Sequence, residues 1–332
     1  MQKILVTGGG GYIGSHAVKK LLKEGHSVVV FDNFFRGYKK PLEILKKYGE
    51  LVVFNGDLKN KEDVQKVFEE NKIDAVMHFG ALCLVNESME KPEMYFENNV
   101  FGTLNLLNAM KDNNVRKIVF SSTCAVYGDA QYLPVDEKHP TNPTNPYGES
   151  KLMCEKIIKW YGELYNFNYA ILRYFNVCGA DMEGEIGDSK KPSELLVQNA
   201  VRGALGLQDF KLTCPKVESK DGTPVRDYID VEDLVEAHLK ALQYIDADKS
   251  LVCNIGNGDG LSVKEVIQKV KDELGVDFPL DTGEARKGEY TVIYADNSLA
   301  KDALRFNSKK DLKDSINSLA RWYKNNPNGF DY

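Results

Sequence analysis

The sequence lacks any long apolar run. Its longest uninterrupted apolar stretch is residues 81–85, whereas a helix that crosses a bilayer needs about 20 apolar residues. Near the N-terminus, residues 4–6 are followed at once by polar Thr7, so the core of a signal peptide is missing. We therefore expect no membrane segment and a cytoplasmic protein.

The sequence also lacks paired cysteines and an excess of positive charge. Its six cysteines are scattered without a CxxC pair, and no pair among its five histidines has zinc-ligand spacing, which favours reduced thiols and no structural metal. Lysine and arginine total 43 against 49 acidic residues, a net charge of −6. This balance argues against a nucleic-acid partner, although backbone N–H groups could still bind a phosphate locally.

The sequence does contain a regular alternation of predicted strands and helices. Short apolar runs at 3–7, 27–32, 51–55, 75–79, 117–121 and 169–172 are separated by segments with helical spacing, such as Ile13, Ala17 and Leu21. Strands that alternate with helices predict βαβ units and a parallel sheet. We expect a Rossmann-type doubly wound α/β fold.

The regular alternation of predicted strands and helices ends at residue 176. Residues 177–192 and 211–224 have the glycine and proline content of loops. Beyond them the pattern predicts helices at 231–242, 262–274 and 312–323 and a strand at 251–255. At about 150 residues per domain, the 332 residues allow two units. We predict a first domain at 1–175, with elements returning to it around 228–260, and a smaller α/β lobe at 176–332.

A glycine-rich stretch directly follows the first predicted strand. Gly8, Gly11 and Gly14 have the spacing GxxGxxG and open the first helix. Glycine at such positions allows a tight turn, close approach of a pyrophosphate and close helix packing. Asp32 ends the second strand, where a carboxylate binds the adenosine ribose and repels a 2′-phosphate. The pattern predicts NAD rather than NADP, although Arg36 nearby favours NADP. The alternative is that the glycines form a purely structural turn.

Three polar side chains could meet above the predicted sheet. Thr123 follows the fifth strand, whereas Tyr147 and Lys151 are four residues apart and share one face of a helix. Strand ends in open α/β sheets line the ligand crevice. An ammonium near a phenol lowers the pKa of the phenol, so Tyr147 could remove a proton from a sugar hydroxyl. The alternative is a solvent-facing Tyr and Lys.

At these residues the chain resembles the extended short-chain dehydrogenase/reductases, and among them the UDP-glucose 4-epimerases. The stretches that carry the resemblance are 6–16, 32–33, 56–57, 78–79, 87–88, 91–92, 98–100, 121–128, 147–151, 173–176, 221–229 and 327–330. The resemblance implies inversion at C4 of a UDP-hexose through a 4-keto sugar, with bound NAD as transient hydride acceptor. It also implies a homodimer joined through helices at 93–113 and 145–165.

The resemblance assigns roles to individual residues. The catalytic set would be Thr123, Tyr147 and Lys151. Cofactor contacts would come from Gly8, Gly11, Tyr12, Ile13, Gly14, Asp32, Asn33, Asp57, Leu58, Phe79, Asn98 and Phe175. The UDP-sugar would be bound by Asn176, Leu196, Arg226, Arg286, Glu289 and Ile293. Two guanidinium groups suit a diphosphate.

Several positions depart from the family pattern. Cys83 stands where a lysine often contacts NAD, Thr213 stands where an aromatic residue often packs near uracil, and Asp230 replaces a histidine. Ile293 stands at the position that gates the C2 substituent of the sugar. Its bulk predicts a poor fit for UDP-N-acetylhexosamines.

The residues after Thr123 bear on which reaction of this family the chain performs. By resemblance, related 4,6-dehydratases and decarboxylases carry an acidic residue just after the Ser/Thr, where this chain has Cys124 and Ala125. A non-catalytic NAD-binding protein of the same fold is a further alternative, although it would be expected to lack Tyr147 or Lys151. Epimerisation of another UDP-sugar, a UDP-pentose or a UDP-N-acetylhexosamine, also stays open.

Overall fold

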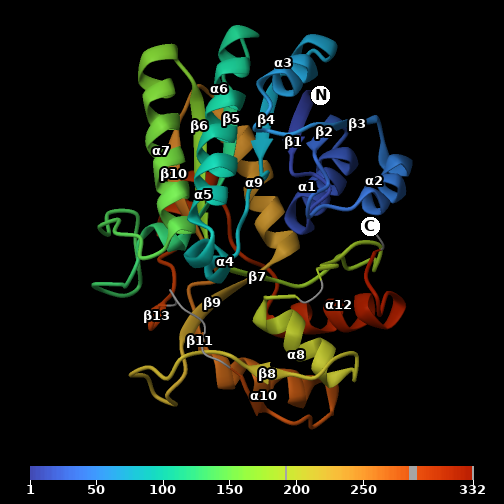
Figure 1. The fold of residues 1–332 in the computed structure, drawn as a ribbon, viewed down its shortest axis with the longest axis vertical. Coiled ribbons are helices and arrows are strands. Elements are labelled where there is room, and N and C mark those ends of the chain that lie inside the picture. The colour runs from blue at the N-terminus through green and yellow to red at the C-terminus, as the bar shows by residue number, and fades with distance from the viewer. Residues whose placement is uncertain (191–192, 284–289, 331–332) are drawn as a thin grey trace.

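A parallel sheet of seven strands lies at the centre of the larger lobe of the protein (Figure 1). The computed structural model describes residues 1–190, 193–283 and 290–330. The strand order is β3-β2-β1-β4-β5-β6-β10, and every neighbouring pair in it is parallel. The strands are β1 (Lys3–Thr7), β2 (Ser27–Asp32), β3 (Leu51–Asn55), β4 (Ala75–His78), β5 (Lys117–Thr123), β6 (Asn168–Tyr174) and β10 (Leu251–Ile255).

Helices cover both faces of this sheet because its strands are apolar on both sides. Ile4 and Val6 pack on one face with helices α1, α2, α9 and α11, whereas Leu5 packs on the other with α3, α6 and α7. These helices are α1 (Tyr12–Lys23), α2 (Lys39–Leu45), α3 (Lys61–Glu70), α6 (Gly102–Asp112), α7 (Pro146–Tyr165), α9 (Val231–Asp246) and α11 (Ser298–Leu304). The chain reverses its winding between β1 and β4, and ligands bind at such a switch point.

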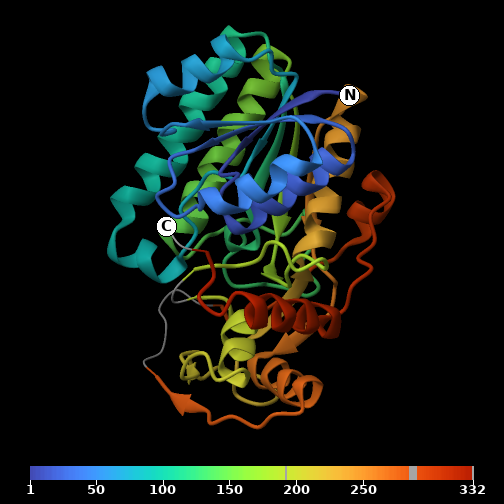
Figure 2. The ribbon, with the colours of Figure 1, turned by 90° about the vertical axis from the view of Figure 1, so that its right-hand side faces the viewer.

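A smaller lobe lies below the large sheet (Figure 2). In it β9 (Val225–Asp230) pairs with β7 (Asn176–Cys178), β11 (Gly260–Ser262) and β13 (Val292–Ile293). A separate pair joins β8 (Lys211–Leu212) to β12 (Asp281–Thr282). The apolar faces of α8 (Leu196–Ala204), α10 (Val263–Leu274) and α12 (Leu312–Asn325) pack together in one core.

The predicted fold class is confirmed, and most elements lie where the sequence predicts them. The strand Leu251–Ile255 lies in the large sheet beside β6. The short β7 was missed inside a predicted loop, because three residues carry too little periodicity to predict a strand. The predicted helix at 93–113 consists of α5 (Pro92–Tyr95), a π-helical segment Phe96–Phe101 and α6. Within the described residues, no helix is both long and apolar enough to cross a membrane.

Candidate active site

A cavity of about 430 Å³ lies between the carboxyl ends of the large sheet and the smaller lobe. Most residues predicted for the site from the sequence line it. They are Gly8, Gly11, Tyr12, Ile13, Gly14, Asp32, Asn33, Leu58, Phe79, Asn98, Thr123, Tyr147, Lys151, Phe175, Asn176, Leu196 and Arg226. The fold thus brings three groups of residues, predicted separately for cofactor, catalysis and substrate, to one cavity.

The glycine loop between β1 and α1 leaves no space for side chains at two positions. A Cβ on Gly14 would lie 2.1 Å from the carbonyl oxygen of Gly8, and Gly8 itself has a positive φ of +70°. Helix α1 begins after Gly11, which has no side chain to cap it. The first N–H groups of a helix have no partner within the helix, so this end of α1 offers donors and a positive dipole end to the cavity.

The predicted ribose carboxylate is held by backbone donors. Asp32 accepts hydrogen bonds from the N–H of Gly10 at 2.9 Å and of Phe34 at 2.8 Å. Burial raises its pKa, against those two hydrogen bonds. Asn33 donates to Asp57 at 3.1 Å; Asp57 lies behind Asn33 and outside the cavity lining. The uncapped helix, the glycine contacts and Asp32 together fit a dinucleotide with a diphosphate and a free ribose.

The predicted catalytic residues come from β5 and from the first two turns of α7. Asn145 caps α7 by accepting from the N–H of Gly148 at 2.8 Å, and Pro146 occupies the first turn, both typical of a helix start. This capping fixes Tyr147 over the end of β5. The Tyr147 side chain is only 9% exposed, and the Thr123 hydroxyl forms a hydrogen bond with its phenol.

Burial controls the protonation of the two α7 residues. It raises the pKa of Tyr147 well above its usual value, while the hydrogen bond from Thr123 lowers it. Burial also lowers the pKa of Lys151 to about 8. The Lys151 ammonium donates to the carbonyl of Ser121 at 2.8 Å. In the protein alone, desolvation dominates the pKa of the phenol, in contrast to the lowering by Lys151 that the sequence predicts.

The opposite wall of the cavity comes from the smaller lobe. The guanidinium of Arg226 donates to the carbonyls of Val225 at 3.0 Å and Tyr290 at 2.5 Å, so its position is fixed by β9 and by the chain leading into β13. Ile293 is fully buried and packs in the same apolar core as Tyr290 and Tyr147, outside the cavity lining. Arg286 and Glu289 lie outside the described residues.

Sequence reasoning missed some of the lining residues. Tyr290 lines the cavity and accepts a hydrogen bond from the Asn145 side chain at 2.7 Å. Lys190 reaches the cavity from the loop after β7. Neither belongs to a local motif, so no sequence signal could have placed them. Cys83 and Thr213, noted only as departures from the family pattern, also line the cavity.

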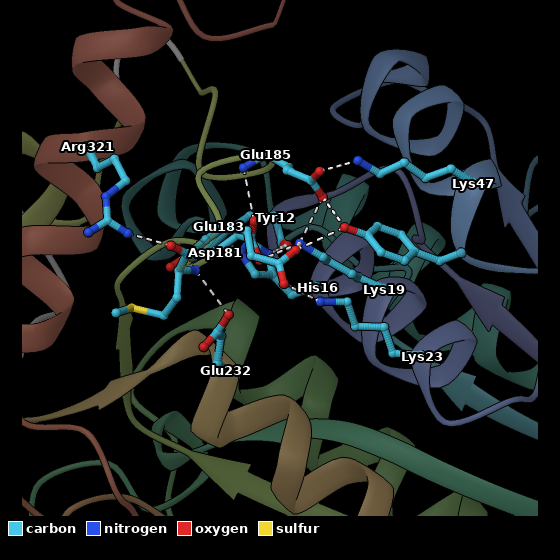
Figure 3. Close-up of polar contacts among 12 residues, drawn as sticks. Tyr12, His16, Lys19, Lys23, Lys47, Asp181, Glu183, Glu185, Glu232 and Arg321 are labelled. Carbon is cyan, nitrogen blue, oxygen red and sulfur yellow. Dashed lines mark hydrogen bonds and ion pairs between the residues drawn. The ribbon is translucent and has the colours of Figure 1, made fainter.

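An ionic cluster joins α1 to the loop at 179–190 (Figure 3). The buried ammonium of Lys19 lies 2.7 Å from Asp181, 2.8 Å from Glu183 and 2.9 Å from Glu185. The three carboxylates are close enough together to hold a metal ion, and the lysine of the chain itself occupies the centre of the group. Tyr12, which lines the cavity, donates from its hydroxyl to the carbonyl of Gly179 in the same loop.

The sequence matches one family of known proteins over most of its length. The profile of the NAD dependent epimerase/dehydratase family matches residues 4–256. A UDP-glucose 4-epimerase of Lactobacillus helveticus is 42% identical over 99% of both chains. UDP-arabinose 4-epimerase 1 of Arabidopsis thaliana is 40% identical over 98% of this chain and 80% of its own length.

Solved structures give the same result. The UDP-glucose 4-epimerase of Bifidobacterium longum in complex with NAD+ and UDP superposes with a TM-score of 0.95 at 37% identity, covering 99% of this chain and 100% of the other. The enzyme from Stenotrophomonas maltophila with bound NAD and formylated UDP-arabinopyranose has a TM-score of 0.93 at 35% identity, covering 98% and 99% of the two chains.

Proposed function

Because the chain belongs to the NAD dependent epimerase/dehydratase family, we propose that it is a nucleotide-sugar 4-epimerase that interconverts UDP-glucose and UDP-galactose. The proposal rests above all on one observation. The glycine loop, the pair of Thr123 and Tyr147, and Arg226 line the same cavity. The residues proposed for cofactor binding, for catalysis and for the substrate diphosphate therefore share one cavity.

The roles of the residues follow from their positions. Tyr147, hydrogen-bonded to Thr123, is placed to take the proton of the sugar 4-hydroxyl as a phenolate and to return it as a phenol after inversion. NAD, when bound, would supply the acceptor for the hydride from C4, and its positive nicotinamide would favour the phenolate. Lys151 contributes positive charge beside the phenol, and Arg226 binds the diphosphate of the UDP-sugar. We assign cofactor binding to residues 1–175 and substrate binding mainly to 176–332.

The residues after Thr123 favour epimerisation over dehydration. Cys124 and Ala125 are buried and apolar, and burial raises the pKa of the Cys124 thiol to about 12. Neither side chain can serve as an acid or base at C5 of the sugar near neutral pH. This composition supports a reaction confined to C4.

A UDP-pentose is the second candidate substrate. Relatives named UDP-arabinose 4-epimerase are about as similar to this chain as those named UDP-glucose 4-epimerase. The resemblance places Ile293 at the gate for the C2 substituent of the sugar, but the residue is buried outside the cavity lining, so a UDP-N-acetylhexosamine is tested as a third substrate.

The decisive experiment incubates purified protein with UDP-galactose and no added cofactor, and follows the products by NMR. UDP-glucose is the expected product, which would also show that NAD is retained through purification. UDP-arabinose and UDP-N-acetylgalactosamine are run in parallel. Failure with UDP-galactose both alone and with added NAD, together with turnover of UDP-arabinose, would transfer the assignment to the pentose.

We further propose that the protein is a homodimer. Large apolar side chains are exposed on the outer sides of the π-helical segment and α7: Phe101 60%, Trp160 57% and Leu164 61%. Such a patch on a surface helix marks a contact with another protein, and a second copy would bury both helices. Light scattering should give a dimer, and Trp160→Glu with Leu164→Glu should give a monomer. Met89→Glu, an exposed apolar position on α4 (Val85–Glu90), is the control.

The compartment we propose is the cytoplasm. All six cysteines are free, and free thiols are typical of a reducing environment. Fractionation of cells that express the natural gene would test this, with recovery in the secreted fraction as the contrary result.

A further inference from the structure

The loop at 179–190 places a lysine against the cavity wall that carries Cys83. The Lys190 ammonium lies 3.8 Å from the Cys83 sulfur, although the two residues are 107 positions apart. Both residues line the cavity. A cation therefore occupies the neighbourhood of Cys83 even though position 83 itself carries none.

The charges around Lys190 locate it along the cavity. Its pKa is raised, first by the electrostatic pull of Cys83 and, against burial, by Asp188, while Arg36 lowers it. The Lys190 ammonium is therefore charged at neutral pH. Cys83 in turn acts on the pKa of Tyr147 and Lys151. Arg36 itself forms an ion pair with Glu87 at 2.6 Å, four residues after Cys83.

The segment that carries Cys83 lies against the glycine loop. A Cβ on Gly8 would lie 2.7 Å from the backbone nitrogen of Gly80, and the N–H of Gly80 donates to the hydroxyl of Thr7 at 3.2 Å. The glycine loop is the part of such a site that a dinucleotide diphosphate approaches. A cation beside Cys83 is therefore placed near the diphosphate.

The loop that carries Lys190 is held in place by contacts on either side. The Tyr38 hydroxyl donates to the carbonyl of Ser189 at 2.9 Å, and the Trp322 indole donates to the carbonyl of Asp188 at 3.2 Å. The Lys19 cluster fixes the earlier part of the same loop to α1. Little further ordering of the backbone is needed for the ammonium to bind a ligand.

We propose that Lys190 is a further NAD-binding residue, whose ammonium binds the cofactor diphosphate from the side opposite α1 and supplies the cation that position 83 lacks. The end of α1 contributes about half a positive charge, which leaves most of the charge on a diphosphate unneutralised. The proposal rests on the proposed function, since it concerns the same cofactor.

The other diphosphate, that of the UDP-sugar, lies at a different end. The guanidinium of Arg226 donates to the carbonyls of Val225 and Thr291 beside β13, and its charge acts on Cys124. Loss of Lys190 should therefore weaken NAD binding and leave UDP binding unchanged.

The experiment compares the wild type with Lys190→Met, Lys190→Arg and the double variant Cys83→Lys/Lys190→Met. Lys138→Met, which removes an exposed lysine outside the cavity lining, is the matched control. NAD content after purification and the NAD dissociation rate are measured, with UDP affinity measured separately. Circular dichroism verifies that each variant is folded.

Loss of a charge-assisted hydrogen bond should raise the NAD dissociation rate of Lys190→Met by about tenfold or more, with unchanged UDP affinity. Lys190→Arg and the double variant should return to within about threefold of the wild type, since each restores a cation. The proposal is overturned if Lys190→Met behaves like Lys138→Met, if UDP affinity falls instead, or if neither cation restores NAD retention. A wild type that binds NAD but lacks turnover would contradict the proposed function instead.

Discussion

The two walls of the cavity are built in different ways. The wall from the large sheet consists of strand ends and helix starts, so Gly8, Gly14 and Tyr147 are set by local motifs. The wall from the smaller lobe brings Lys190, Arg226 and Tyr290 together from three distant segments. Arg226 belongs to β9, whereas Lys190 and Tyr290 lie outside helices and strands, and contacts to backbone carbonyls help to hold this wall.

The difference indicates how chemistry and specificity are divided. A sheet edge with capped helices keeps the reacting groups in fixed positions, as proton and hydride transfer require. The loop residues of the other wall can change without disturbing the large sheet. The Lys19 cluster joins the two, because its lysine belongs to α1 and its carboxylates to the loop at 179–190.

The largest expected effect comes from the sheet wall. Tyr147→Phe removes the group that we propose as the base at the 4-hydroxyl, so kcat for UDP-galactose should fall by about a thousandfold while NAD stays bound. Tyr132→Phe, at an exposed tyrosine bonded to Asp136, should retain full activity. A Tyr147→Phe enzyme with a large fraction of wild-type turnover would remove the basis for the assigned base.

The second largest effect is a loss of stability at the Lys19 cluster, which joins the two walls. Lys19→Met leaves Asp181 and its two neighbouring carboxylates without their shared cation, and should lower the free energy of unfolding by about 3 kcal/mol. Lys23, one turn along α1, contacts Glu183 at an exposed position, so Lys23→Met should cost less than about 1 kcal/mol. Urea unfolding of both variants measures the difference, and equal losses would mean that the buried centre has no special role.

A substitution in the wall from the smaller lobe should change the affinity for the substrate. Arg226→Met should raise KM for the UDP-sugar by about tenfold, with a smaller change in kcat and with NAD retained. Arg116, which also donates to backbone carbonyls but lies at the far end of α6, is the control for general loss of such contacts. An unchanged KM in a folded Arg226→Met enzyme would separate this residue from the substrate.

The smallest effect is a pH dependence of stability at the base of the lobe. Burial raises the pKa of Asp230 to about 7, against a hydrogen bond from Ser315. The folded state then binds more protons than the unfolded state between about pH 4 and about pH 7, so its contribution to stability falls as pH rises through that window.

Asp230→Asn removes this dependence and keeps an oxygen to cap α9. The variant should be more stable than the wild type by about 1 kcal/mol at about pH 8. Urea unfolding across the pH range measures it. A wild type and variant with parallel pH profiles would show that Asp230 titrates normally.

The sheet and its ligand edge could be predicted from the sequence because the signals are local. The apolar strand Lys3–Thr7, the glycine spacing that follows it and the four-residue spacing of Tyr147 and Lys151 each fit within one element or turn. Strand ends differed by a few residues, as for β5, which continues to Thr123, since periodicity marks an element better than its limits.

The parallel sheet, the glycine loop and the helix face of Tyr147 can be read from the sequence, since these depend on backbone geometry over short distances. The contact of Lys190 with Cys83, that of Tyr290 with Asn145, and the burial that raises the pKa of Tyr147 come from the folded arrangement. The physical reason is the same for all three: contacts between distant segments and loss of solvent arise from packing, which spacing along the chain does not encode.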